Sequence, residues 1–94
     1  MKLSKMFIIV NPKDNVATAK VFLRCKKRLM HENKRIITLK EDIPAGYKVA
    51  IREIHCGDPV KKYGERIGLA TKNILPGEKV HIHNLEGERG RGAN

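Results

Sequence analysis

Three copies of the pattern Ile-x-x-Gly-x-x-Val restrict the fold of this chain more than any other feature. The copies span residues 43–49, 54–60 and 74–80. In each copy the glycine supplies a turn conformation that residues with a Cβ atom adopt only at a cost, and the flanking apolar residues anchor both arms of the turn in one core. The pattern predicts a compact, loop-rich, mostly β domain and excludes a βαβ fold, which needs crossover helices. The uneven spacing of the copies argues against a solenoid.

The first half of the chain supplies the other predicted elements. Runs of apolar and β-branched residues predict strands at 7–10, 21–23 and 35–39, with a loop over 30–34. Asp14 or Asn15 is suited to cap a brief helix over 16–20, because the side-chain oxygen accepts a hydrogen bond from a free backbone N–H. We therefore expect a mostly β fold with one or two short helices.

The composition limits the size and the setting of the protein. Its 94 residues make one small domain, and with only four aromatic residues the core must be built from Ile, Val, Leu and Ala. The longest apolar run, 6–10, is far shorter than the roughly 20 residues that cross a membrane, and no secretory signal is expected. Cys25 and Cys56 fit a reducing cytoplasm better than a disulfide framework. We expect a cytoplasmic protein without membrane contact.

The net charge of +10 is concentrated in the N-terminal part of the sequence. Residues 1–40 hold eleven Lys and Arg against two acidic residues, whereas residues 41–94 hold nine against eight. Such a charge attracts phosphate backbones, acidic proteins or small carboxylates without discriminating among them, or it is only a solvated surface. Nucleic acid is not the expected partner, because aromatic pairs for base stacking are lacking and one Arg-Gly-Arg-Gly element is weak evidence for RNA binding.

His81 and His83 are the residues hardest to explain as scaffold. If their β-branched run forms a strand, both imidazoles point to one face, roughly 7 Å apart. Such a pair can share a metal ion or an acidic substrate, although a stable metal site needs three or four ligands and the sequence does not identify the others. In the run 61–68, Lys62 or Arg66 is suited to bind a carboxylate, unless that segment is only a decorated hairpin.

Five segments, which follow one another over nearly the whole chain, together resemble the SAF domain of the altronate and galactarate dehydratase family. They are Pro12-x-Asp14-Asn15-Val16-Ala17, Asp42-Ile43-Pro44-Ala45-Gly46-x-Lys48-x-Ala50, Lys62-Tyr63-Gly64-x-x-Ile67-Gly68-x-Ala70-Thr71, Val80-His81-x-His83-Asn84 and Arg89-Gly90-Arg91-Gly92. The resemblance implies a small β-clip fold over residues 1–85. The Arg/Gly tail at 86–94 is expected to dock on a large subunit.

The resemblance also implies an activity and a partner. In that family the domain occurs fused to a large catalytic domain or as a separate small subunit, and we expect the separate form, inactive alone. The implied reaction is β-elimination of water from an acidic sugar, a 2-hydroxy acid, usually with divalent iron or manganese. Related sulfolactate sulfo-lyases expel sulfite instead. The chemistry needs a base, a cation that holds the enolised carboxylate, and an acid for the leaving group.

The residue chemistry predicts roles within such a reaction. His81 and His83 are suited to proton transfer or to an incomplete, shared metal site. The predicted substrate-binding cations are Lys48, Lys62, Arg89 and Arg91. Tyr47 stands where the family often has a histidine, which predicts an altered substrate choice or reduced activity. The alternative function is a stand-alone SAF-type binding or assembly module without catalysis.

Overall fold

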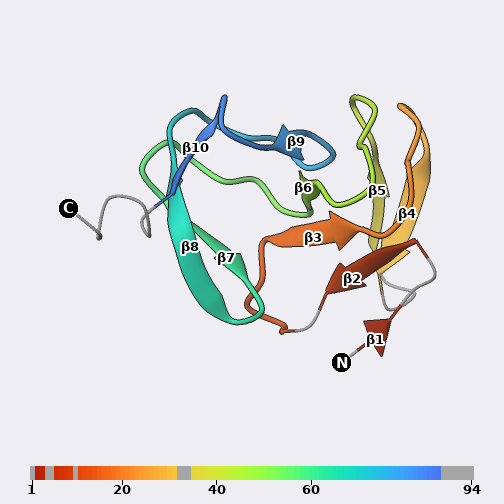
Figure 1. Cartoon of the computed structure of the whole chain (residues 1–94), viewed down its shortest axis with the longest axis horizontal. Coiled ribbons are helices and arrows are strands. Elements are labelled where there is room, and N and C mark those ends of the chain that lie inside the picture. Colours follow the sequence, from red (N-terminus) through yellow and green to blue (C-terminus); the bar gives the residue numbers. More distant parts are fainter. Residues whose placement is uncertain (1, 4–5, 10, 32–34, 88–94) are drawn as a thin grey trace.

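The fold consists of short strands in three sheets (Figure 1). A computed structural model describes residues 2–3, 6–9, 11–31 and 35–87, and no helix is found among them. The mostly β prediction is therefore confirmed, whereas the short helices are not present in this part of the chain. The strands are β1 (Lys2–Leu3), β2 (Phe7–Ile9), β3 (Val16–Ala19), β4 (Arg28–His31), β5 (Arg35–Thr38), β6 (Lys48–Ala50), β7 (Pro59–Lys62), β8 (Glu65–Ala70), β9 (Lys79–Val80) and β10 (Leu85–Gly87).

An antiparallel sheet in the order β1-β2-β3-β6-β9 contributes to two hydrophobic cores. Successive strand residues point to opposite faces, so adjacent residues of one strand join different cores. In β6, Val49 belongs to the first core, which also contains residues of the β4–β5 hairpin, and Ala50 belongs to the second, which contains residues of β7 and β8. Figure 1 shows these two hairpins at opposite ends of the molecule. The molecule thus has two small cores, built mainly from aliphatic residues.

Four similar turns frame these cores, at residues 24–27, 44–47, 55–58 and 75–78. In each turn the N–H of the fourth residue donates to the carbonyl of the first, at 2.9–3.1 Å. The third residue has a positive φ, which is 72° at Lys26 and 88–94° at the three glycines. Lys26 therefore occupies a position that favours glycine. The Gly-based sequence pattern missed this first turn for that reason.

A shift of 31 residues relates the two halves of the domain. The N–H of Cys25 donates to Asp42 Oδ1 at 2.7 Å, and 31 positions later the N–H of Cys56 donates to Asn73 Oδ1 at 2.8 Å. The two isolated β-bridges and the four turns follow the same shift. The sequence pattern is unevenly spaced because a pair of turns, rather than a single turn, is the unit that is repeated.

The helix predicted over 16–20 is wrong, because this segment forms β3. The side chains expected to cap a helix bind distant parts of the chain instead. Asp14 accepts hydrogen bonds from the N–H groups of Tyr63 and Gly64, and Asn15 bonds to the backbone of β7. These tertiary bonds favour the extended conformation that β-branched residues such as Val16 also prefer.

The other predicted strands have mixed outcomes. β2 and β5 confirm the strands expected around 7–10 and 35–39, with Val10 outside the described residues. The strand expected at 21–23 is wrong, since Val21 and Phe22 are exposed and lie in no strand, and only Leu23 forms a β-bridge. The first two residues of the expected loop over 30–34 belong to β4, which extends to His31, and residues 32–34 lie outside the described residues. Within the described ranges there is no helix of the length and hydrophobicity that a membrane crossing requires.

Candidate functional site

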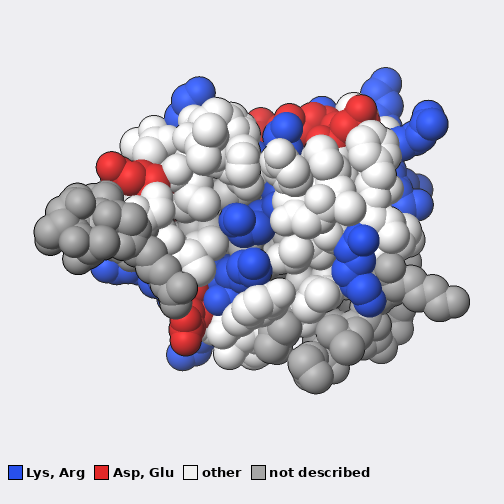
Figure 2. Space-filling model, in the orientation of Figure 1, with Lys and Arg blue, Asp and Glu red and all other residues white. Residues whose placement is uncertain are grey.

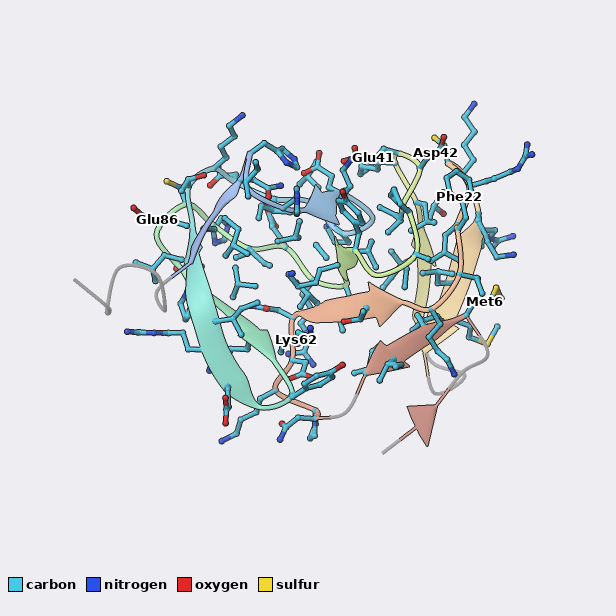
Figure 3. All side chains as sticks on the ribbon, viewed as in Figure 1. Met6, Phe22, Glu41, Asp42, Lys62 and Glu86 are labelled. Carbon is cyan, nitrogen blue, oxygen red and sulfur yellow. The ribbon has the colours of Figure 1, made fainter. Side chains whose placement is uncertain are left out.

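Two lysines from strands of different sheets form the centre of the candidate site, and we call them the lysine pair. Lys48 of β6 lies opposite Thr18 of β3 and Val80 of β9, and Lys62 is the last residue of β7. Burial lowers the pKa of Lys48, and the positive charge of Lys62 lowers this pKa further. Basic side chains gather at the centre of the face in Figure 2, around the position at which Figure 3 labels Lys62.

The lysine pair is suited to bind an anion. A carboxylate beside the two ammonium groups relieves their repulsion and raises the pKa of Lys48 toward its ordinary value. One group of acidic side chains lies at the upper rim of the same face, where Figure 3 labels Glu41 and Asp42, and smaller groups lie at its left edge and lower left (Figure 2). Both carboxylates accept backbone hydrogen bonds there, from the N–H groups of Lys79 and Cys25. The positive charge of the pair is therefore available to a ligand.

A buried carboxylate fixes the turn that follows Lys62. Asp14 is only 1% exposed. Its carboxylate accepts hydrogen bonds from the N–H of Tyr63 at 2.9 Å and from the N–H of Gly64 at 2.7 Å. A β-bulge in the β7–β8 ladder adds local twist just before this turn. The Lys62 amine lies 4.9 Å from the centre of the Tyr63 ring, within the range of a cation–π contact. Asp14 thus positions Lys62 through the backbone of the turn.

A second group of side chains surrounds His81. The ring centres of His81 and Tyr47 are 4.6 Å apart, with an angle of 46° between the rings. The amine of Lys79 lies 5.4 Å from the centre of the Tyr47 ring. Tyr47, at the position where the resemblance implied a histidine, therefore restricts the orientation of His81 by ring packing.

The two histidines do not share the face of a strand, so that expectation is wrong. β9 ends at Val80, and the next four residues form a turn closed by the bond from the Asn84 N–H to the His81 carbonyl, at 3.1 Å. Asn84 is only 4% exposed. Its side chain accepts a hydrogen bond from the His81 N–H at 2.9 Å and donates one to the Lys79 carbonyl at 2.8 Å. The hydrogen bonds of this buried amide favour the turn over the strand that the β-branched run 80–85 predicts. His83 is exposed on this turn.

Comparison with known protein families assigns the domain. A profile described as "Altronate/galactarate dehydratase SAF domain" matches residues 5–88. The chain belongs to this SAF domain family. The lysine pair and the group around His81 both lie inside the residues that the SAF domain profile matches.

The relatives of this SAF domain are lyases. The altronate dehydratase of Bacillus subtilis (strain 168) is 39% identical over 82 residues, which are 87% of this chain and 16% of that protein. The altronate dehydratase of Escherichia coli (strain K12) is 37% identical over 78 residues, 83% of this chain and 16% of that protein. The (2R)-sulfolactate sulfo-lyase subunit alpha of Paracoccus pantotrophus is 43% identical over 53 residues, 56% of this chain and 79% of that subunit. The match thus spans only 16% of the length of the two dehydratases.

The described part of the SAF domain does not fit a metal ion by itself. No group of three or more His, Cys, Asp or Glu side chains arranged to hold an ion is found in residues 2–3, 6–9, 11–31 and 35–87. His81 and His83 are two candidates on a turn, whereas stable sites use three or four ligands. Divalent iron or manganese therefore requires ligands from outside these residues.

The structure adds one residue to the candidate site, and two of the predicted site residues lie outside its described part. The hydroxyl of Thr18 is buried without a hydrogen-bond partner, and Thr18 is the register partner of Lys48. No sequence signal identified it, because 16–20 was expected to be a helix and the pairing with β6 is a tertiary feature. Arg89 and Arg91 lie outside the described residues of the SAF domain, as does most of the predicted tail, whose first two residues belong to β10.

Proposed function

We propose that this SAF domain is the small subunit of a sugar-acid hydro-lyase of the altronate dehydratase type, which acts in the cytoplasm together with a separate large subunit. The lyase relatives support a lyase, and the match to 79% of a sulfo-lyase subunit supports a multi-subunit enzyme. The observation that carries the proposal is the lysine pair, which offers positive charge to a carboxylate within the family domain.

In this proposal Lys48 and Lys62 bind the carboxylate of a 2-hydroxy acid. A base removes the proton from the carbon next to the carboxylate, hydroxide leaves the neighbouring carbon with a proton, and the product is an enol and water. Negative charge accumulates on the carboxylate as the proton leaves. The two amines therefore stabilise the transition state more than the ground state.

The proposal assigns the histidines to this domain's part of the site and the metal to the large subunit. His81, oriented by Tyr47, and the exposed His83 either transfer protons or contact the large subunit. We assign the divalent iron or manganese ion implied by the resemblance to the large subunit. The packing of Tyr47 on His81 supports the predicted change in substrate choice or activity.

Reconstitution tests this function. The purified chain is mixed with a large dehydratase subunit from the same genome and with Fe²⁺ or Mn²⁺, and formation of the 2-keto acid from altronate is measured. We expect turnover from the mixture and none from either subunit alone. Lys62→Gln should lower turnover by about 100-fold or more, the usual effect of removing one group that stabilises an oxyanion. Lys72→Gln, a change of an exposed lysine outside the site, is the charge-matched control.

Two results would contradict these assignments. A complex that forms but has no activity on altronate or related hydroxy acids would favour a binding or assembly module without catalysis. Full activity of the double variant His81→Ala, His83→Ala in the assembled enzyme would remove both histidines from the proposed site.

A further inference from the structure

The segment 21–27 exposes two apolar side chains beside a group of cations. Val21 is 44% exposed and Phe22 is 55% exposed, and the turn that follows carries the exposed residues Arg24, Lys26 and Lys27. We call these five residues the apolar–basic surface. Figure 3 labels Phe22 at the right-hand end of the molecule and Lys62 near its centre, so this surface lies outside the candidate site.

The 31-residue shift between the two halves provides an internal comparison. Residues 52–58 have the same exposure as residues 21–27, with only the third residue of each segment buried, and the same hydrogen-bonded turn ends both segments. The two exposed residues at the start of the second segment, however, are Arg52 and Glu53, and Glu53 lies 3.6 Å from the imidazole of His55. The backbone therefore requires neither an exposed apolar pair nor a group of unpaired cations at 21–27.

Lys26 has a conformation that favours glycine. Its φ is 72°, and the equivalent residue 31 positions later is Gly57, with a φ of 91°. The N–H of Lys26 donates to the Leu39 carbonyl at 2.8 Å, a bond that glycine would also make, and the lysine side chain is exposed. Backbone strain of this kind is concentrated at functional positions. The feature that lysine adds to this turn is its charge.

The cations of the apolar–basic surface are not neutralised by the described part of the chain. None of Arg24, Lys26 and Lys27 forms an ion pair with a described residue. The carboxylate bound to this turn is that of Asp42, which accepts from the N–H of Cys25 at 2.7 Å. Three cations beside one carboxylate leave a positive surface, which is complementary to an acidic one.

The apolar pair favours a protein partner over a phosphate polymer. Single-stranded nucleic acids bind to successive aromatic side chains, on which their bases stack. The apolar–basic surface instead has one aromatic ring, that of Phe22, next to the aliphatic Val21. Protein interfaces combine an apolar centre, in which aromatic residues are enriched, with a polar rim. The surface therefore fits a protein face that has an apolar pocket surrounded by carboxylates.

We propose that the apolar–basic surface docks on an acidic face of the large subunit, with Phe22 in an apolar pocket and the three cations opposite carboxylates. This inference rests on the proposed function, which supplies the large subunit. It does not depend on the Arg/Gly tail or on the roles of the lysine pair. The surface contributes affinity between the subunits and takes no part in the chemistry.

Calorimetric titration of the full chain into the purified large subunit, which needs no turnover, tests the proposal. Phe22→Ser should weaken association by about tenfold or more, because an exposed aromatic anchor is lost while no core is opened. Leu75→Ser changes an apolar side chain of the other half that is 42% exposed, and this matched control should bind as the unchanged chain does. At a saturating concentration of the large subunit, Phe22→Ser should regain full turnover, which separates docking from catalysis.

The charge of the surface provides the second part of the test. Lys26→Glu should weaken association by about tenfold at low ionic strength, and roughly 0.5 M salt should reduce this difference. Lys72→Glu, at an exposed position outside the surface, is the charge-matched control and should have no effect. Lys26→Gly should weaken association by about threefold although it stabilises the fold, a combination that a purely structural role of Lys26 would not produce.

Three results would overturn the proposal, and they are distinguishable. Full turnover of a complex in which Phe22→Ser and Lys26→Glu bind as tightly as the unchanged chain would remove the docking surface and leave the proposed function intact. If Phe22→Ser keeps its affinity for the large subunit but loses binding to polyuridylate, binding to phosphatidylglycerol vesicles or self-association, the surface belongs to that other occupant. No association of the unchanged chain with the large subunit would contradict both the proposed function and the docking.

Discussion

Gly46 and Gly77 occupy equivalent positions in the two halves, and replacing each with alanine separates two costs. Both have a positive φ, 88° and 94°. A Cβ at residue 46 meets no heavy atom within 4 Å, whereas at residue 77 it overlaps the carbonyl oxygen of Thr38 and lies 3.3 Å from Leu39 Cα. Gly46→Ala therefore tests the backbone conformation alone. Gly77→Ala tests the same conformation together with a collision against backbone atoms.

The expected losses of stability follow from these contacts. A side chain in the left-handed region costs about 1–2 kcal/mol, and the lower entropy of the unfolded chain offsets about 0.4–1 kcal/mol. Gly46→Ala should thus lower the free energy of unfolding by about 1 kcal/mol. Forcing the backbone around residue 77 to move adds about 1–3 kcal/mol, as overpacking of a core does. Gly77→Ala should therefore lower the free energy of unfolding by about 2–4 kcal/mol.

Urea denaturation followed by far-ultraviolet circular dichroism measures both losses in the full chain. The comparison requires equal slopes of free energy against urea, which shows that both variants expose the same surface on unfolding. Equal losses at residues 46 and 77, or a larger loss at residue 46, would refute the argument that the contact with Thr38 makes the second turn intolerant of a side chain.

Four further predictions concern single side chains. Lys26→Gly should raise the free energy of unfolding by about 0.5–1 kcal/mol in urea denaturation, because glycine accepts the positive φ at lower cost; a loss would contradict this. Asp14→Asn should lower the free energy of unfolding by about 2–4 kcal/mol, since the backbone N–H groups of Asn11, Tyr63 and Gly64 lose a charged acceptor, and unchanged stability would refute the positioning role of Asp14. Lys62→Gln should raise the pKa of Lys48, measured by NMR titration of its side chain, although burial still holds that pKa below 10.5. Between its lowered folded pKa and 10.5 the unfolded chain binds more protons, so Lys48 makes stability rise with pH, and Lys48→Met should flatten that rise.

Local sequence signals predicted the parts of the fold that local chemistry controls. The three glycine turns depend on the backbone preference of one residue, and the strands β2 and β5 depend on apolar runs of a few residues. The turn at Lys26 escaped the pattern because tertiary contacts hold a lysine in a glycine conformation. The predicted helix failed because Asp14 and Asn15 find their partners in and after β7, a long way along the chain.

The candidate site shows the same division. The sequence predicted Lys48 and Lys62 as cations for a carboxylate, which stays a prediction, and the fold brings their charges close enough to act on one another. The expected strand pair of His81 and His83 failed, because the buried side chain of Asn84 closes a turn that no propensity of the apolar run reveals. Thr18 was missed since its place beside Lys48 depends on strand register.

The sequence by itself determined the family, the mostly β character, the repeated turns and the chemical kinds of side chain available to a site. These properties follow from residue identity and from interactions over a few positions. Only the tertiary structure decided which side chains meet, namely the two lysines of the lysine pair and the rings of Tyr47 and His81. Strand register and the bonds of Asp14, Asn15 and Asn84 join distant segments, and hydrophobic burial in two cores fixes those registers.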